Sequence, residues 1–280
     1  MLQSIMKIRE YSLPPGWYPR DKEEISSFLS DYLTENNSFQ AAIAPHAGWF
    51  YSGRIAAISV SGLERSAETV VVLGGHLGGG MPVLYAMEDA VQTPFGPMPI
   101  DTQLRSLLLE ETGGKEDRYR DNTIEVLLPM VKFFFPYAKL IWLRLPAEIS
   151  SFKAGKIIAK TADSLNRKIN VLASTDLTHY GSNYGFNSHG SGRNALQWVK
   201  EVNDRNFITA VESGKPEEVL ARSELDQSSC SAGAVLGAIG FAQAASLPKA
   251  RLLEYATSAD VHSEGGVPDS FVGYASFAFC

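Results

Sequence analysis

Short apolar runs alternate with helix-forming segments along this chain, and the alternation limits the folds that the chain can adopt. Seven runs have the length and apolar character of buried strands: 41–44, 70–73, 82–86, 139–145, 170–173, 252–257 and 271–279. Segments with the character of helices precede or separate most of them: 21–33, 55–63, 102–109, 122–134, 152–165, 193–211 and 231–245. The pattern predicts an α/β fold of three layers, in which helices flank a predominantly parallel or mixed sheet of about seven strands.

The chain is expected to form one domain, residues 1–280. No internal repeat, low-complexity tract or linker of distinct composition interrupts the pattern of strands and helices. Hydrophobic residues make up 45% of the 280 residues and charged residues 20%, so the chain has enough apolar surface to build a core without staples.

Charge and hydropathy argue against two kinds of partner, nucleic acids and membranes. The net charge is −6, and basic residues cluster no further than pairs such as Arg167–Lys168, so the chain lacks a basic surface for phosphate backbones. No run approaches the roughly 18 apolar residues of a membrane span, and the first ten residues contain no signal-peptide core. Two cysteines, Cys230 and Cys280, cannot form a disulfide framework. We therefore expect a cytoplasmic protein with free thiols.

Three of the five histidines come soon after predicted strands. They are His46, His76 and His179, which follow the first, second and fifth apolar runs. Because ligands bind outside the carboxyl ends of the strands in open α/β sheets, these imidazoles are expected to face one crevice. Asp176 lies three residues before His179 and is expected to bind a metal or to orient that histidine.

Cys230 directly precedes the predicted helix 231–245, and the partial positive charge of a helix N-terminus favours the thiolate. A thiolate beside imidazoles is either a soft metal ligand or a nucleophile with a base nearby. Together these residues predict one polar pocket. Its expected metal ligands are His46, His76 and Cys230, and its expected catalytic residues are Cys230, His179 and Asp176.

Other residues of similar chemistry receive simpler interpretations. Two histidines, His189 and His262, are expected to lie on the surface, and Cys280 is expected to have no role. Glu125 serves either as the capping partner of Asn122 or as a pocket residue. The aromatic residues that follow His46 are expected to pack, or to form an apolar wall of the pocket: Trp49, Phe50 and Tyr51.

Several common motifs are missing from the sequence. The glycine run 78–80 lacks the spacing of both standard phosphate-binding loops, so no nucleotide cofactor is expected. H-E-x-x-H, G-x-S-x-G and C-x-x-C do not occur, which excludes zincin, serine hydrolase and thioredoxin-type assignments.

Five segments of the chain have a distinctive composition and order: 16–19 (GWYP), 44–53 (APHAGWFYSG), 125–129 (EVLLP), 174–181 (STDLTHYG) and 271–275 (FVGYA). The same segments occur in this order in the Memo family, whose bacterial and archaeal members are called AmmeMemoRadiSam system protein B. The chain resembles this family over nearly its whole length. The resemblance implies a fold similar to that of the class III extradiol ring-cleaving (LigB-like) dioxygenases. It also implies a pocket that binds reduced copper or iron, and the residues that match the family's pocket are His46, His76, Asp176, His179 and Cys230.

The chain departs from the family pattern at two places. Asn122 stands where the family commonly has a histidine, and an amide is neither a base nor a comparable ligand for soft metals. The segment Gly74–Leu77 is one residue shorter than the family's G-P-x-H form. Both departures point to a reduced or redirected ancestral activity.

The leading hypothesis is a metal-dependent, redox-related protein with a dioxygenase-like site and copper or iron, rather than zinc, as cofactor. An iron site of two histidines and one carboxylate needs Asp176 or Glu125 as third ligand, whereas a copper site prefers Cys230. Two other classes stay open. One is a non-catalytic module that holds a small molecule, peptide or protein in an enzyme-like pocket. The other is a hydrolase or transferase in which Cys230 attacks and His46 or His179 takes the proton.

Overall fold

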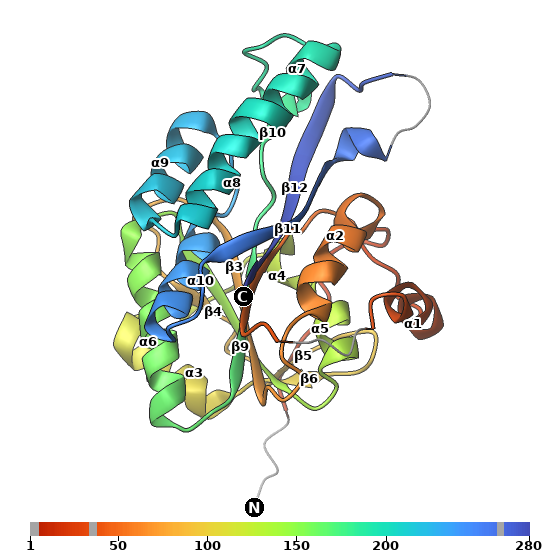
Figure 1. The fold of residues 1–280 in the computed structure, drawn as a ribbon. Coiled ribbons are helices and arrows are strands. Elements are labelled where there is room, and N and C mark those ends of the chain that lie inside the picture. Colours follow the sequence, from red (N-terminus) through yellow and green to blue (C-terminus); the bar gives the residue numbers. More distant parts are fainter. Residues whose placement is uncertain (1–5, 34–37, 262–265) are drawn as a thin grey trace, which may run out of the picture.

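The computed structural model describes residues 6–33, 38–261 and 266–280, and it shows a mixed sheet between two layers of helices (Figure 1). The four central strands are parallel and lie in the order β2, β9, β3, β8. They are β2 (Ala41–Ala44), β3 (Thr69–Leu77), β8 (Lys139–Pro146) and β9 (Ile169–Ser174). The predicted α/β fold with a sheet flanked by helices is confirmed.

Shorter and antiparallel strands complete the sheet on both sides. They are β4 (Leu84–Tyr85), β7 (Lys115–Glu116), β10 (His179–Gly181), β11 (Ala250–Thr257) and β12 (Ser270–Phe279). β12 runs antiparallel to β2, β10 and β11, and β4 runs antiparallel to β8. Over the described residues the sheet has nine strands, the seven predicted ones with β7 and β10 added. A separate small sheet contains β1 (Ile8–Arg9), β5 (Ala90–Val91) and β6 (Met98–Pro99).

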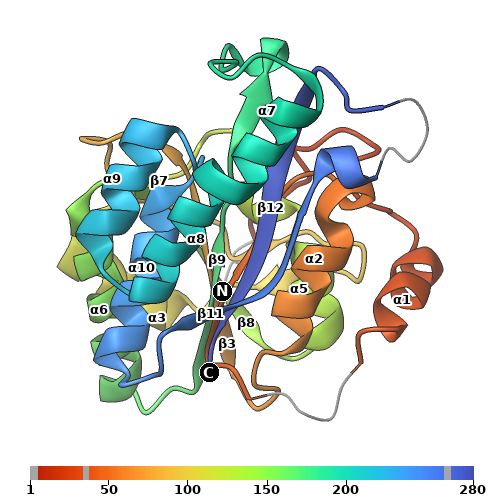
Figure 2. The same ribbon diagram turned by 45° about the horizontal axis from the view of Figure 1, so that its top comes forward.

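Helices cover both faces of the sheet (Figures 1 and 2). One face carries α3 (Thr102–Thr112), α6 (Ile149–Ser164), α8 (Asp204–Ser213), α9 (Pro216–Asp226) and α10 (Ala232–Ala244). The other carries α1 (Lys22–Ser30), α2 (Trp49–Ser61) and α5 (Leu128–Phe134). Side chains alternate along the strands. Val71 and Leu73 therefore pack in the core on the face that carries α6 and α10, and Val70 and Val72 pack in the core on the opposite face.

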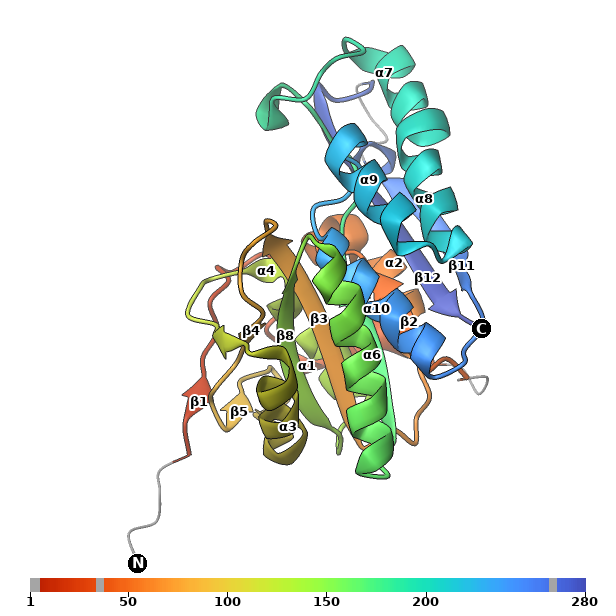
Figure 3. The same ribbon diagram turned by 90° about the vertical axis from the view of Figure 1, so that its left-hand side faces the viewer.

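Helices α6 and α10 lie side by side on one face of the sheet (Figure 3). The alanine- and glycine-rich sequence of α10 lets the two backbones touch. A Cβ added at Gly155 would overlap the carbonyl of Gly237, and one at Gly240 would overlap the carbonyl of Phe152. Close packing of the segment 231–245 is therefore a consequence of its small residues.

Two predicted helices are interrupted in the structure. The segment 122–134 consists of α4 (Asn122–Glu125) and α5, and Asp121 rather than Asn122 caps it, by accepting from the backbone N–H of Thr123. The segment 193–211 consists of α7 (Gly192–Trp198), a π-turn at Val199–Asn203, and α8. The prediction of one continuous helix is wrong for 122–134, whereas the predicted helix 193–211 is confirmed, with a π-turn inside it. Apolar periodicity does not register such local changes in the helical hydrogen-bond pattern.

The first part of β12 extends beyond the body of the sheet, where it pairs with β10 and lies beside α7 (Figure 2). A small apolar cluster holds this extension together, with Tyr180, Ala195 and Phe271 buried in it. A 3₁₀ turn at Ser182–Tyr184 follows β10 directly. In the part of the chain that the structure describes, no helix has both the length and the apolar character needed to cross a bilayer.

Candidate functional site

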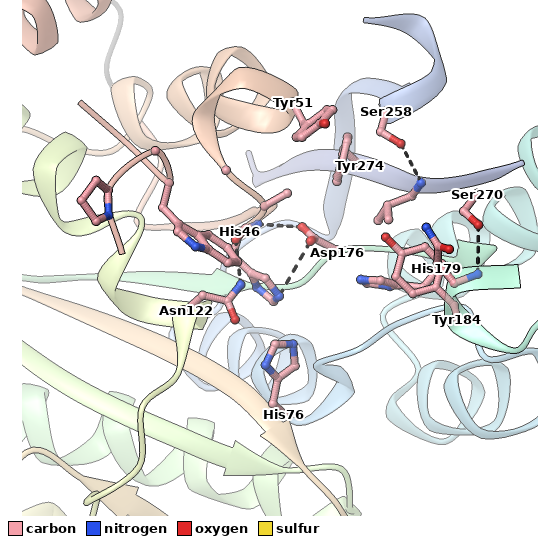
Figure 4. A pocket seen from close by; sticks show the side chains of 17 residues that line it. His46, Tyr51, His76, Asn122, Asp176, His179, Tyr184, Ser258, Ser270 and Tyr274 are labelled. Carbon is pink, nitrogen blue, oxygen red and sulfur yellow. Dashed lines mark hydrogen bonds and ion pairs between the residues drawn. The ribbon is translucent and has the colours of Figure 1, made fainter. Parts of the chain in front are cut away.

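A cavity of about 700 Å³ lies at the carboxyl ends of β2, β3 and β9. Four of the five pocket residues expected from the sequence line it: His46, His76, Asp176 and His179. The remaining wall is made of aromatic and small polar residues, together with Pro15–Trp17 near the N-terminus: Pro15, Gly16, Trp17, Ala47, Gly48, Tyr51, Asn122, Asn183, Tyr184, Ser258, Ser270, Val272 and Tyr274. Figure 4 shows His46, His76 and Asn122 on one side of the cavity, and His179 and Tyr184 on the other.

Cys230 does not line the cavity, but its sulfur contacts a residue that does. The Sγ atom lies 3.2 Å from Nε2 of His46, and the backbone N–H of Cys230 donates to the carbonyl of Asp176. The rings of His46 and His76 meet edge to face, with centroids 4.9 Å apart. His46, His76 and Cys230 each have one possible metal-binding atom, a ring nitrogen or the sulfur, within 4.8 Å of those of the other two.

Charge in this cluster favours a thiolate. Burial disfavours ionisation of Cys230, but the charge of His46 and hydrogen bonds from His46 and His76 outweigh it, so the pKa of the thiol lies well below its usual value. Burial likewise disfavours a charged His46, yet Asp176 and Cys230 raise the pKa of that imidazole. Without a metal, the cluster is therefore a thiolate beside imidazolium.

Neighbouring polar groups fix the direction of His46. Its Nδ1 lies 2.7 Å from the hydroxyl of Ser174, and its backbone N–H donates to Oδ1 of Asp176. Since Nδ1 is engaged, Nε2 is the nitrogen that remains for Cys230 or a metal. Asn122 donates from its amide to the carbonyl of His46 at 3.0 Å. Asn122 thus supports the backbone beside the cluster.

His76 adopts an uncommon backbone conformation, with a φ of 58°. Its Nδ1 lies 2.9 Å from Oδ2 of Asp121, so Nε2 again remains for the cluster. Burial opposes charge on His76, but the hydrogen bonds to Asp121 and Cys230 raise its pKa to about 10. Burial also opposes charge on Asp121, while the bond to His76 and the charge of Arg144 lower its pKa to about 2. The carboxylate is therefore ionised at neutral pH, and Nδ1 of His76 carries a proton that it donates to Asp121.

His179 and Asp176 occupy the cavity outside the three-residue cluster. Nδ1 of His179 lies 3.1 Å from the carbonyl of Leu177, and its ring meets that of Tyr184 edge to face. Burial raises the pKa of Asp176 above its usual value, although His46 opposes the shift. Oδ2 of Asp176 lies 3.9 Å from Nε2 of His46, in contact range of the cluster.

Glu125 has neither of the roles expected from the sequence. Its buried carboxylate accepts hydrogen bonds from the backbone N–H groups of Ser12 and Leu13, and from the hydroxyl of Tyr18 at 3.0 Å. Arg20 lies 3.8 Å away. Glu125 therefore anchors the N-terminal segment whose residues 15–17 line the cavity.

His189, Cys280, the glycine run and the aromatic residues after His46 lie at different places in the fold. Of the aromatic residues after His46, Trp49 is buried and packs, Phe50 is exposed, and Tyr51 lines the cavity. His189 is exposed and stacks on Trp198. His262 lies outside the described residues, and Cys280 is exposed. The glycine run 78–80 forms a loop in which the N–H of Gly80 donates to the carboxylate of Glu148. In a phosphate-binding loop such an N–H group would donate to the phosphate instead.

Sequence reasoning missed Asp121, Ser174 and Tyr184. Asp121 was detectable in principle, because an aspartate before a short helix is a typical cap, although its second partner, His76, is 45 residues away. Ser174 and Tyr184 carry no sequence signal that separates them from other polar loop residues.

The donor atoms of the cluster suit a soft or borderline transition metal. Two imidazole nitrogens and a thiolate match the preferences of copper, zinc and iron, and hard cations such as magnesium prefer oxygen. The carboxylate of Asp121 on the far nitrogen of His76 is the support that metal-binding histidines usually have. The residues present therefore fit a bound metal ion.

Comparison with known proteins places the chain in one family. Residues 9–278 match the family model of the Memo-like proteins. A MEMO1 family protein of Pyrococcus abyssi is 30% identical, over 96% of this chain and 98% of its own length. One of Pyrococcus furiosus is 31% identical, with the same shares of the two chains covered. The crystal structure of an uncharacterized protein from Escherichia coli K12 is similar in fold, with a TM-score of 0.50 and 14% identity over 85% of this chain and 99% of that one. This chain belongs to the family of Memo-like proteins.

Proposed function

We propose that this Memo-like chain is a metal-dependent, redox-related protein in which His46, His76 and Cys230 bind copper(I) or iron(II). The observation that carries the proposal is the convergence of two imidazole nitrogens and one thiol within 4.8 Å, beside a cavity of about 700 Å³. When bound, the metal would supply one-electron chemistry or bind dioxygen or substrate as a Lewis acid. A small molecule or short peptide is the proposed occupant of the cavity. A reducing cytoplasm, which keeps thiols free, is the proposed location.

The donor set favours copper(I) over an iron site of the carboxylate type. Such an iron site needs Asp176 or Glu125 as third ligand. Glu125 is occupied by the N-terminal segment. Oδ1 of Asp176 already accepts from the backbone of His46, and Oδ2 lies 3.9 Å from Nε2 of His46, farther than the sulfur of Cys230. The thiol of Cys230 is the third donor closest to the imidazoles, and thiolates prefer soft ions.

Asp176 and His179 are proposed to act on the molecule in the cavity. Both line it, and the raised pKa of Asp176 lets a carboxyl hold a proton closer to neutral pH than usual. His179 has one nitrogen engaged by the carbonyl of Leu177, which leaves the other for the occupant. The two residues can thus hold or pass a proton on a bound ligand.

The test is a competition titration of copper(I) and iron(II) against wild type, His46→Ala and Cys230→Ser, with metal analysis of protein purified without added metal. Each variant loses one of three ligands, so we expect copper(I) affinity to fall by more than about 100-fold, beyond the loss typical of outer-sphere changes. Asn122→Ala is the matched control, because Asn122 lines the same cavity but its amide is no comparable ligand for a soft metal, and it donates to the backbone of His46 rather than to its ring. Equal affinity of wild type and His46→Ala would reject the metal site.

A second candidate is a cysteine hydrolase or transferase, and the contact between Cys230 and His46 favours it. A thiolate of lowered pKa with an imidazole 3.2 Å away is the pair that such enzymes use. An acyl or alkyl adduct on Cys230, found by mass spectrometry after incubation with activated esters and lost in His46→Ala, would support this function. Failure of the metal titration without such an adduct would favour the non-catalytic binding module.

A further inference from the structure

A chain of buried charged residues extends from His76 away from the cavity. Oδ2 of Asp121 lies 2.9 Å from Nδ1 of His76 and 3.1 Å from Nη2 of Arg144. Nη1 of Arg144 lies 3.3 Å from Oδ1 of Asp117, which comes directly after β7. Arg144 is 3% exposed and Asp117 is 1% exposed, so solvent does not screen this chain. Neither residue lines the cavity.

Arg144 holds His76 in two ways at once. Besides its contact with Asp121, its Nε donates to the carbonyl of Gly75 at 2.9 Å, and Gly75 is the residue just before His76. One planar guanidinium therefore fixes both the backbone that leads into His76 and the carboxylate that binds its side chain.

The backbone at His76 needs such support. A φ of 58° is strained for a residue with a side chain, and such strain persists only where the surroundings enforce it. The preceding glycines are also closely enclosed. A Cβ at Gly74 would overlap the hydroxyl of Thr123, and one at Gly75 would overlap Ser231. The direction of the His76 ring thus depends on the groups packed around this turn.

Asp117 in turn fixes Arg144. Its Oδ2 accepts from the indole N–H of Trp142 at 2.9 Å, and its Oδ1 accepts from the backbone of Tyr119. Arg9 lies over the ring of Trp142 and donates to the carbonyl of Asp117. A buried guanidinium is costly unless it is paired, and two carboxylates from the loop between β7 and α4, Asp117 and Asp121, pair with it here.

We infer that Arg144, held by Asp117, is a positioning residue that directs Nε2 of His76 toward His46 and Cys230. Arg144 thereby sets the affinity of this three-residue cluster for a soft metal. The inference rests on the proposed function for the affinity, but the orientation of His76 can be observed without metal. Arg144 acts through Asp121 and Gly75 and does not itself touch the cluster.

The experiment uses Arg144→Lys, which keeps the charge but replaces the planar fork with one ammonium that cannot reach Asp121, Asp117 and Gly75 together. We expect copper(I) affinity to fall about 10- to 100-fold, the usual cost of losing support behind a metal ligand. In metal-free protein labelled with ¹⁵N, we expect the slowly exchanging, downfield Nδ1–H signal of His76 to disappear. Its assignment comes from its absence in His76→Gln.

Arg105→Lys is the matched control, because Arg105 also donates to backbone carbonyls, those of Ala86 and Glu88, but has no link to His76. It should keep both the affinity and the signal. If Arg144→Lys does not fold, Asp117→Asn takes its place, with the same two losses expected at smaller size.

An Arg144→Lys protein with wild-type copper(I) affinity and an intact Nδ1–H signal would overturn the positioning role. If wild type binds neither copper(I) nor iron(II), the proposed function fails, and the Nδ1–H signal alone still decides whether Arg144 orients His76.

Discussion

At Cys230 a single thiol is placed between imidazoles and the start of α10. Ser231 caps this helix, so Cys230 lies at its positive end, and the sulfur contacts His46. Burial opposes the thiolate, but the charge and hydrogen bonds of the two histidines lower the pKa of the thiol well below its usual value. The reactivity of this residue therefore reports on the assembled cluster.

We predict that Cys230 of metal-free protein reacts with iodoacetamide at pH 6.5 at least about tenfold faster than an ordinary thiol, whose pKa is about 8.5. Because the pKa is lowered, the thiolate persists as the pH falls from 8 to 6.5, so the rate should change little over that range. Peptide mass spectrometry separates Cys230 from the exposed Cys280. Cys230→Ser should lose the fast phase, and copper(I) should mask it. Equal labelling rates at both cysteines would mean an inert, structural thiol.

Some site residues could be predicted from the sequence, and others could not. His46 and Asp176 follow β2 and β9, His76 lies at the end of β3, and His179 comes soon after β9. Parallel strands bring such positions to one edge of a sheet. Arg144 carried a weaker signal, a lone charge between Leu143 and Leu145 in an apolar strand. That pattern indicates a buried partner but does not identify it, because Asp117 and Asp121 come from a loop whose path is set only by tertiary packing.

At the scale of elements, α6 and α10 touch along their backbones. The contact depends on glycines in both helices, since Cβ atoms at Gly155 and Gly240 would overlap carbonyl groups of the opposite helix. Helix α10 cannot shift toward the sheet to make room, because Gly237 already lies against Leu73 and Leu145. Such a contact tolerates no added volume.

We predict that Gly155→Ala lowers the free energy of unfolding by about 1–3 kcal/mol, the usual cost of overpacking, despite the better helix propensity of alanine. Urea denaturation followed by circular dichroism measures the change. Gly78→Ala is the control, because a Cβ there meets no atom within 4 Å, and its effect should stay within about 0.5 kcal/mol. A Gly155→Ala protein as stable as wild type would show that the helices separate at no cost.

Apolar periodicity predicted the long elements well and their interruptions poorly. The π-turn at Val199–Asn203 brings two consecutive residues to one neighbour: Asn203 donates to the hydroxyl of Thr178, and Asp204 accepts from its backbone. That arrangement supports the turn between Asp176 and His179. Apolar periodicity carries no information about such tertiary hydrogen bonds, so the sequence pattern of this segment predicts one regular α-helix.

At the scale of the whole molecule, the N-terminal segment completes the cavity from outside the main sheet. It pairs with β5 at Ile8 and Arg9, bonds to Glu125 through Ser12 and Leu13, and then places Trp17 in the cavity wall. The backbone carbonyl of Trp17 also accepts from Trp49 at the start of α2. One buried carboxylate thus connects the outermost layer of the fold with the site.

We predict that Glu125→Ala speeds tryptic cleavage after Arg20 at least about tenfold. Each hydrogen bond to a charged group contributes about 1.5–3 kcal/mol, so the N-terminal segment opens more often when the carboxylate is lost. Cleavage is followed by mass spectrometry under native conditions. Glu116→Ala, which removes an exposed carboxylate bonded to Arg118, should cleave like wild type. Unchanged cleavage in Glu125→Ala would mean that other contacts hold the segment.

The cluster joins residues from three distant parts of the chain, and His46 and Cys230 are 184 positions apart. On a ribosome, His46 and His76 emerge long before the thiol that completes the set. An ion that requires all three donors can be captured only after most of the polypeptide has been synthesised and the sheet has closed around the cavity. A metal that needs all three ligands would therefore bind only to complete, folded chains, and truncated or misfolded chains would not bind it.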